Sequence, residues 1–344
     1  MSELRPGGSE GDGAAQLLAS ARARVSAAAA DLALPQGLRL TDRQRATVQA
    51  LLGQLVRSVE DELRAALGEI AAAEPLRAAL SSAHVEIAMP VLAASGTALA
   101  EPALVDLLLR RAEEHRLHRA AASESAFLVE LAGDADETVA REAMALLIAQ
   151  NGRLDGFREP VLPRSDLPAE LEHHLVWTVA AALRRYMIAR HDADPASCDS
   201  ALAAAAAQIL ARHDEGETAE ARAMRLARAL RMAGRIEEED ILARALAEGS
   251  LPLFIALLAL RTGLAAAAVW ELLAADSGPA LLLRAASVRR DEAAAILLAW
   301  GTNEAALSSA LHRFDGTSAA SGRSLLTLWS VDTGYRAAVA RLEQ

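Results

Sequence analysis

The chain has 344 residues and a formal net charge of −11 at pH 7, and all 35 of its Lys and Arg residues are arginine. Hydrophobic residues make up 53% and aromatic residues only 3%, which excludes a disordered chain and an aromatic-rich β-sandwich. The absence of lysine excludes a Walker A phosphate loop, a lysine Schiff base and the Lys–Glu pair of a kinase.

Alanine and leucine dominate the composition. Both are strong helix formers, because they lose little side-chain entropy in a helix. We therefore expect an all-α chain. The negative charge and the shortage of rings for base stacking argue against a nucleic-acid partner. The single cysteine, Cys198, cannot form an internal disulfide or a cysteine metal cage, and this fits a reducing cytoplasm.

The N-terminal part predicts a polar tail and a helical hairpin. Residues 1–13 are glycine-rich and lack a basic start followed by an apolar run, so we expect no secretory signal. Apolar residues follow a coiled-coil spacing along 14–34 and again along about 42–72. Thr41 and Gln44 form a candidate capping box between the two segments. The hairpin, residues 14–73, either packs on its own domain or forms a homodimer.

Shorter helices are expected over residues 74–155, at 76–81, 83–94, 102–112, 114–122, 124–132 and 136–150. Short amphipathic helices cannot bury their apolar faces alone, which favours an α-solenoid. The stretch from Asp136 to Ala143 is similar to the second helix of a HEAT-type repeat. Residues 156–168 hold three prolines and little periodicity, which predicts an inter-domain linker.

A second helical set is expected over residues 169–300, followed by a C-terminal helical tail over 301–344. The candidates are 168–191, 195–213, 217–234, 237–248, 251–262, 264–275, 279–287 and 290–300. The most apolar stretch, 251–275, is interrupted by Arg261 and Gly263 after about ten residues, which is too short to span a bilayer. It therefore predicts two buried core helices and no membrane span.

Three stretches resemble a bacterial family built on a domain of unknown function. They are residues 81–123 (beginning SSAHVEIAMPVLAAS and ending EEHRLHRAAAS), 213–236 (HDEGETAEARAMRLARALRMAGRI) and 329–342 (WSVDTGYRAAVARL). The resemblance covers most of the chain from about residue 40. It implies a cytoplasmic, helical, HEAT-like protein and supplies no catalytic residues.

Few residues are spaced for chemistry. Glu114, His115 and His118 form one compact set, and two histidines three residues apart suit a helical metal site. A structural role is favoured for them, so we expect no metal and no cofactor. Cys198 lies near a helix start, which can activate a thiol. The neighbouring acids Asp194 and Asp199 favour the neutral thiol, so Cys198 is expected to be a small core residue.

An arginine-rich face on helix 217–234 is the strongest candidate for a binding site. Its members recur every three or four residues within one half of the helix circumference: Arg222, Arg225, Arg228, Arg231 and Arg235. Leucine and alanine occupy the opposite side. Arginine binds carboxylates and phosphates in a bidentate manner, so this face is either a docking surface or a solvated face paired with Glu217, Glu220 and Glu237–Glu239.

We therefore expect a non-catalytic cytoplasmic scaffold or regulatory protein that binds protein partners and forms a homo-oligomer through residues 14–73. A second hypothesis is a sensor that holds a small anionic, phosphorylated ligand between helices with arginine side chains. An enzyme is the least favoured hypothesis, and it would have to use Glu114, His115 and His118.

Overall fold

The computed structural model describes residues 40–70, 80, 86–94, 99, 101–120, 126–275, 277–301 and 304–342. The regular elements that these residues form are all helices, with no strand among them, which confirms the all-α prediction. The chain divides into two units after Ala46. The predicted helix 14–34 lies outside the described residues.

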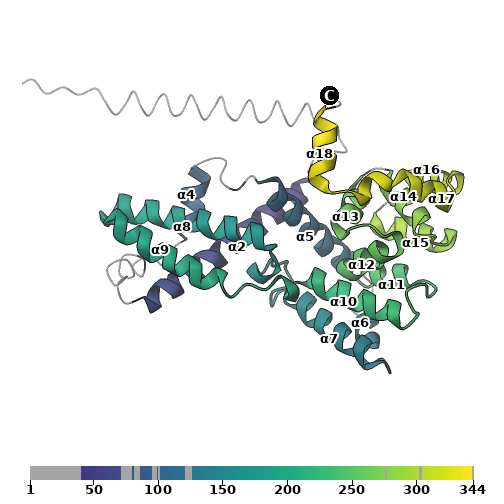
Figure 1. Cartoon of the computed structure of the whole chain (residues 1–344), viewed down its shortest axis with the longest axis horizontal. Helices are drawn as coiled ribbons and strands as arrows, with labels where there is room; N and C mark the ends of the chain where they lie inside the picture. The colour runs from purple at the N-terminus through teal and green to yellow at the C-terminus, as the bar shows by residue number, and fades with distance from the viewer. Residues whose placement is uncertain are drawn as a thin grey trace, which may run out of the picture. The chain divides into compact units, whose positions relative to one another are not determined.

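The helices run from α2 near the start of the described residues to α18 near their end (Figure 1). The α-helices are α2 (Asp42–Glu69), α4 (Ala88–Ala94), α5 (Pro102–Ala120), α6 (Ala126–Ala132), α7 (Glu137–Asn151), α8 (Ala169–His191), α9 (Pro195–Leu210), α10 (Ala219–Met232), α11 (Ile241–Ala247), α12 (Leu251–Thr262), α13 (Ala266–Ala274), α14 (Gly278–Ala285), α15 (Arg290–Trp300), α16 (Glu304–Gly316), α17 (Ala319–Leu325) and α18 (Thr333–Leu342). Three short 3-10 helices are η3 (Arg164–Asp166), η4 (Glu215–Glu217) and η5 (Thr327–Ser330).

Local capping signals set several helix starts. The predicted capping box is confirmed, because the Gln44 amide donates to Thr41 Oγ1 at 3.2 Å and the Thr41 amide donates to Gln44 Oε1 at 3.0 Å. Asp136 caps α7 by accepting from two backbone amides, and Asp194 caps α9 by accepting from the Ser197 amide. Each cap satisfies amides that would otherwise lack a partner.

Two helix predictions are wrong. Residues 102–112 and 114–122 were expected as separate helices, but α5 is continuous from Pro102 to Ala120. No Gly or Pro interrupts it, and Arg116 pairs with Glu113 one turn away at 2.6 Å. The helix expected from residue 237 begins only at Ile241, because Asp240 adopts the left-handed conformation and does not cap it. The buried Glu292 carboxylate instead accepts from the Ala243 amide at 3.3 Å.

Two apolar cores organise the described helices from α2 onward. One core takes its buried side chains from α2, α4, the first half of α5, α8 and α9. The other takes them from the end of α5, α6, α7 and α10–α16. The cores therefore interleave along the chain, and α5 contributes Leu104, Leu107 and Leu108 to the first core but Leu117 to the second.

The segment predicted as a linker, residues 156–168, contains a tight turn and η3. Leu154 and Pro160 form an isolated antiparallel bridge at the base of the turn. Leu162 and Leu167 are buried in the first core. Asp166, in η3, is 7% exposed. This segment is thus packed against the helices on either side of it.

The apolar stretch 251–275 forms two helices, as predicted. Every residue of α12 from Leu251 to Ala259 is buried. Among the described residues no single helix has the length and hydropathy to cross a membrane, and α12 with α13 reaches that threshold only as a pair bent by 106°.

Two glycines test the packing of the helices. A Cβ on Gly278 would lie 1.9 Å from the Leu272 carbonyl oxygen, whereas a Cβ on Gly53, inside α2, meets nothing within 4 Å. We expect Gly278→Ala to lower the free energy of unfolding by several kcal/mol, because a backbone atom cannot move away cheaply. Gly53→Ala should raise it by about 0.5–1 kcal/mol. Urea titrations of the two variants check this, and equal midpoints would contradict it.

Candidate functional site

Helix α10 presents the predicted arginine face. Thr218 caps the helix, with its Oγ1 accepting from the Ala221 amide at 3.2 Å. Its apolar side, which includes Ala223, Leu226 and Leu230, is fully buried in the second core. The arginines therefore occupy the outer and lateral sides of the helix, as the spacing predicted.

Three of the five arginines have partners within the chain. Arg222 pairs with Glu217, as the solvated-face hypothesis expected. Arg225 bridges to Glu142 of α7 at 3.2 Å and donates to the Gly216 carbonyl at 2.6 Å. Arg235 binds Asp134 and, at 2.6 Å, Glu238. These contacts hold α10 against α7 and its N-cap turn.

The other two arginines face solvent. Arg228 and Arg231 are exposed, and neither has an ion-pair partner among the described residues. Met232 beside them is 85% exposed, and it lies four residues after Arg228, on the same side of the helix. We refer to Arg228, Arg231 and Met232 as the α10 surface. Because this surface points outward, it gives no support to a ligand held between helices.

The candidate residues Glu114, His115 and His118 line one recess, but each has a different partner. His118 Nε2 lies 3.0 Å from the Arg158 guanidinium. His115 is 7% exposed and its Nε2 lies 3.9 Å from Glu159 Oε2. Glu114 is paired with Arg111 and Arg153. Within the described ranges no group of three His, Cys, Asp or Glu side chains is arranged to hold a metal ion.

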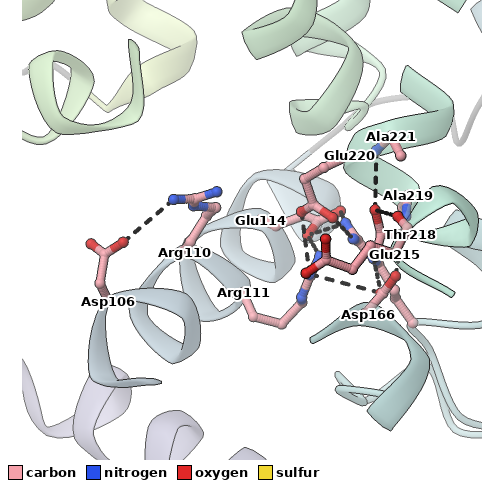
Figure 2. Close-up of polar contacts among 11 residues, drawn as sticks. Asp106, Arg110, Arg111, Glu114, Asp166, Glu215, Thr218, Ala219, Glu220 and Ala221 are labelled. Atoms are coloured by element: carbon pink, nitrogen blue, oxygen red, sulfur yellow. Dashed lines mark hydrogen bonds and ion pairs between the residues drawn. The ribbon is translucent and has the colours of Figure 1, made fainter. Parts of the chain in front are cut away.

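The carboxylate of Glu114 belongs to a buried ion network that sequence reasoning missed (Figure 2). Arg153, 3% exposed, lies at its centre and contacts three carboxylates: Glu114 at 3.0 Å, Asp166 at 2.6 Å and Glu220 at 2.6 Å. Arg111, 2% exposed, pairs with Glu114 and lies 3.4 Å from Glu220.

The network joins four segments that are far apart in the chain. Arg111 and Glu114 come from α5, Arg153 from the turn after α7, Asp166 from η3, and Glu220 from the first turn of α10. Asp166 also accepts from the Ala219 amide at 3.1 Å, so it binds the positive end of α10 directly. The network therefore fixes where α10 begins relative to α5.

Mutual attraction shifts the pKa values of Glu220 and Arg153 toward their charged forms. Burial alone would raise the pKa of the Glu220 carboxyl, but the guanidiniums of Arg153 and Arg111 outweigh it and lower the pKa to about 2. Burial alone would lower the pKa of Arg153, but its three carboxylate neighbours raise it instead. Three carboxylates already surround the two guanidiniums, so neither has charge to spare for an anionic ligand.

The recess beside the network is small. It is lined by α5, the end of α7, and the turn that follows, including His115, His118 and Arg153, and its cavity volume is about 20 Å³. A cavity of this size holds about one water molecule. The position therefore suits a bridging water and is too small for a metabolite.

Cys198 is a core residue, as predicted. Cys198 is fully buried in the first core, in the first turn of α9. Burial raises the pKa of the thiol, against the pull of the Arg184 guanidinium. Arg184 in turn is bound to Asp199. The helix start therefore does not create a nucleophile here.

Comparison with known proteins identifies one family. Residues 87–326 match the family described as "uncharacterised protein conserved in bacteria" (DUF2336). No curated protein and no solved structure gives a significant match. The match covers α4 to α17, and thus all the network residues and the α10 surface.

Removing the central arginine should destabilise the fold. Arg153→Met leaves three carboxylates without their common partner, so we expect a loss of about 3–5 kcal/mol in the free energy of unfolding. The control Arg141→Met changes an arginine whose side chain is 68% exposed and should cost less than about 0.5 kcal/mol. Chemical denaturation measures the stability of both variants. Similar losses in the two would show that the network contributes no more to stability than an exposed arginine does.

The depressed pKa of Glu220 predicts a pH dependence. A carboxyl whose pKa is lower in the folded state stabilises the fold above its unfolded pKa, and this contribution is lost as pH falls from about 4.5 toward 2. Glu220→Gln should be less stable at pH 7 by about 1–3 kcal/mol and should lose less stability over that acid range. If the free energy of unfolding falls equally with pH in wild type and variant between pH 4.5 and 2, Glu220 does not cause the acid dependence.

The burial of Cys198 predicts slow modification. We expect a disulfide reagent to label the native chain at least tenfold more slowly than the chain in denaturant, because the thiolate forms only when the core opens. Absorbance of the released thiol measures both rates. Rapid labelling of the native protein would place the thiol at the surface.

Proposed function

We propose that this chain, which belongs to the DUF2336 family of proteins conserved in bacteria, is a non-catalytic, HEAT-like helical protein that binds an acidic protein partner. The observation that carries the proposal is the α10 surface. Of the four arginines on α10 and Arg235 just beyond its end, three bind acidic side chains or carbonyls of this chain, and two remain exposed beside a methionine.

The chemistry of the α10 surface favours a protein partner with carboxylates. Arginine forms bidentate pairs with carboxylates, and arginine and methionine are enriched in protein interfaces. The chain as a whole carries a net charge of −11, so long-range repulsion opposes an acidic partner everywhere except at local positive patches. An acidic segment that docks here would therefore be held in one place.

The state of the network carboxylates supports a non-catalytic role. Glu220 has a pKa of about 2, so at neutral pH its carboxylate has no proton to donate. Glu114 and Asp166 both accept from Arg153, which uses their lone pairs in fixed ion pairs. A general acid or base needs a carboxyl whose pKa lies near the working pH, and the pKa of Glu220 is held far below it.

The remaining parts of the proposal follow from the sequence. We place the protein in the cytoplasm, as a scaffold or regulatory module, and assign homodimer formation to the hairpin 14–73. Size measurement on the whole chain and on a chain beginning at residue 40 tests the dimer. If both samples contain the same number of chains per particle, the hairpin does not form the dimer interface.

Charge reversal on the α10 surface tests the partner. We expect Arg228→Glu/Arg231→Glu to reduce capture of a purified acidic partner at least tenfold, because two attractive pairs become repulsive. The partner is first identified by pull-down from native lysate with the wild-type chain. Binding of the purified pair is then measured at low and high salt, and it should weaken as salt increases.

The matched control is Arg212→Glu/Arg313→Glu, which makes the same charge change at two exposed arginines outside α10. Both double variants must melt at the wild-type temperature. Equal affinities of the two variants for the partner would remove α10 from the interface and return its arginines to an ordinary solvated face.

A further inference from the structure

A second open pocket lies between α4 and the C-terminal half of α8, away from α10. Its volume is about 320 Å³, within the range of roughly 300–1,000 Å³ common for small-molecule sites. Its lining residues are Glu86, Ile87, Pro90, Val91, Ala94, Arg185, Tyr186 and Arg190. The pocket thus combines an apolar wall from α4 with two arginines from α8.

The wall from α4 is free of polar side chains. The helix reads Ala-Met-Pro-Val-Leu-Ala-Ala. Ala88 and Leu92 are buried against the core, while Pro90 and Ala94 are exposed on the pocket side. Two of the amides at the start of α4 already have a partner, because the buried Glu60 carboxylate accepts from Ile87 and Ala88 at 3.1 and 2.8 Å.

The charge in the pocket is positive. Arg185 and Arg190 stand one and a half turns apart on α8, on either side of Tyr186 and its neighbours. Glu86 is the acidic residue in the lining, and it is bound to Arg57 on α2. Arg190 is exposed and has no ion-pair partner in the described part of the chain. An anionic group placed here would meet guanidiniums rather than carboxylates.

We propose that this pocket binds a small amphiphile with one anionic head group, a carboxylate or a phosphate, on a short saturated chain. The head group would pair with Arg190 and Arg185, since guanidinium forms charge-assisted hydrogen bonds with both anions. The chain would cover Pro90, Val91 and Ala94. Each methylene that leaves water should strengthen binding about fourfold, so affinity should rise with chain length until the wall is covered.

Matched soluble probes test the ligand class on the full chain. Isothermal titration uses decanoate, decanol and decyltrimethylammonium below their micelle concentrations, and acetate as the head group alone. We expect decanoate to bind with one site per chain and at least tenfold more tightly than the other three. Equal affinities for decanoate, decanol and the ammonium probe would overturn the proposal.

Two substitutions on the same helix place the ligand. Ala94→Glu adds a negative charge inside the pocket, whereas Ala93→Glu adds it at an exposed neighbour outside the lining. We expect Ala94→Glu to weaken decanoate binding at least tenfold and Ala93→Glu to change it less than threefold. Arg190→Gln should also weaken decanoate binding while keeping the wild-type melting temperature. An unchanged affinity in Ala94→Glu would remove the ligand from the pocket.

A vesicle arm distinguishes a free amphiphile from a lipid head group. Co-sedimentation uses vesicles of phosphatidylglycerol and of phosphatidylcholine. Binding to the anionic vesicles that Ala94→Glu abolishes and Ala93→Glu preserves assigns the pocket to a lipid. Decanoate binding without co-sedimentation assigns it to a free amphiphile, and the absence of both refutes the site. None of these outcomes depends on the α10 surface.

Discussion

The contact of Arg153 with three carboxylates is the interaction on which the arrangement of the helices depends. This one side chain reaches α5, η3 and the first turn of α10 at 2.6–3.0 Å. Buried ion pairs give little net stability, because removing the ions from water costs about as much as their attraction returns. Their geometry is nevertheless demanding. We therefore interpret the network as a device that specifies one packing of four segments.

The network also determines how the proposed docking surface is presented. Glu220 points inward at the start of α10, and Arg228 follows eight residues later, about 12 Å along the helix axis. Arg225 and Arg235 then bind α7 and its N-cap turn. The helix is fixed at both ends and along one side, so the exposed arginines stand on a rigid support. A rigid support reduces the entropy lost on binding.

The sequence predicted what depends on neighbouring residues. The caps at Thr41, Asp136 and Asp194 and most helix bounds follow from local chemistry. The two cores could not be predicted, because periodicity shows which face of a helix is buried but not which helix covers it. The acidic partners of the arginine face were likewise predictable only where they lie close in sequence. Glu217 is five residues from Arg222 and was anticipated, whereas Glu142 is 83 residues from Arg225 and was not.

The network itself carried only one sequence signal. Arg111 and Glu114 are three residues apart on a helix, a spacing that favours an ion pair. Arg153 and Asp166 lie outside the α-helices, in the turn after α7 and in η3, where no periodicity marks a residue as buried. Glu220 has the position of an ordinary acidic residue in a first helical turn. Only the tertiary fold turns these residues toward one another.

The interleaving of the two apolar cores has a consequence during synthesis. Helices α2 and α4 leave the ribosome long before α8 and α9, against which they pack. About 115 residues separate the end of α4 from the end of α9, and at about 5–20 residues per second their translation takes roughly 6–23 s. During that interval the apolar faces of α2 and α4 lack their final cover. The nascent chain therefore passes through a period in which chaperones and premature self-association compete for the same surface.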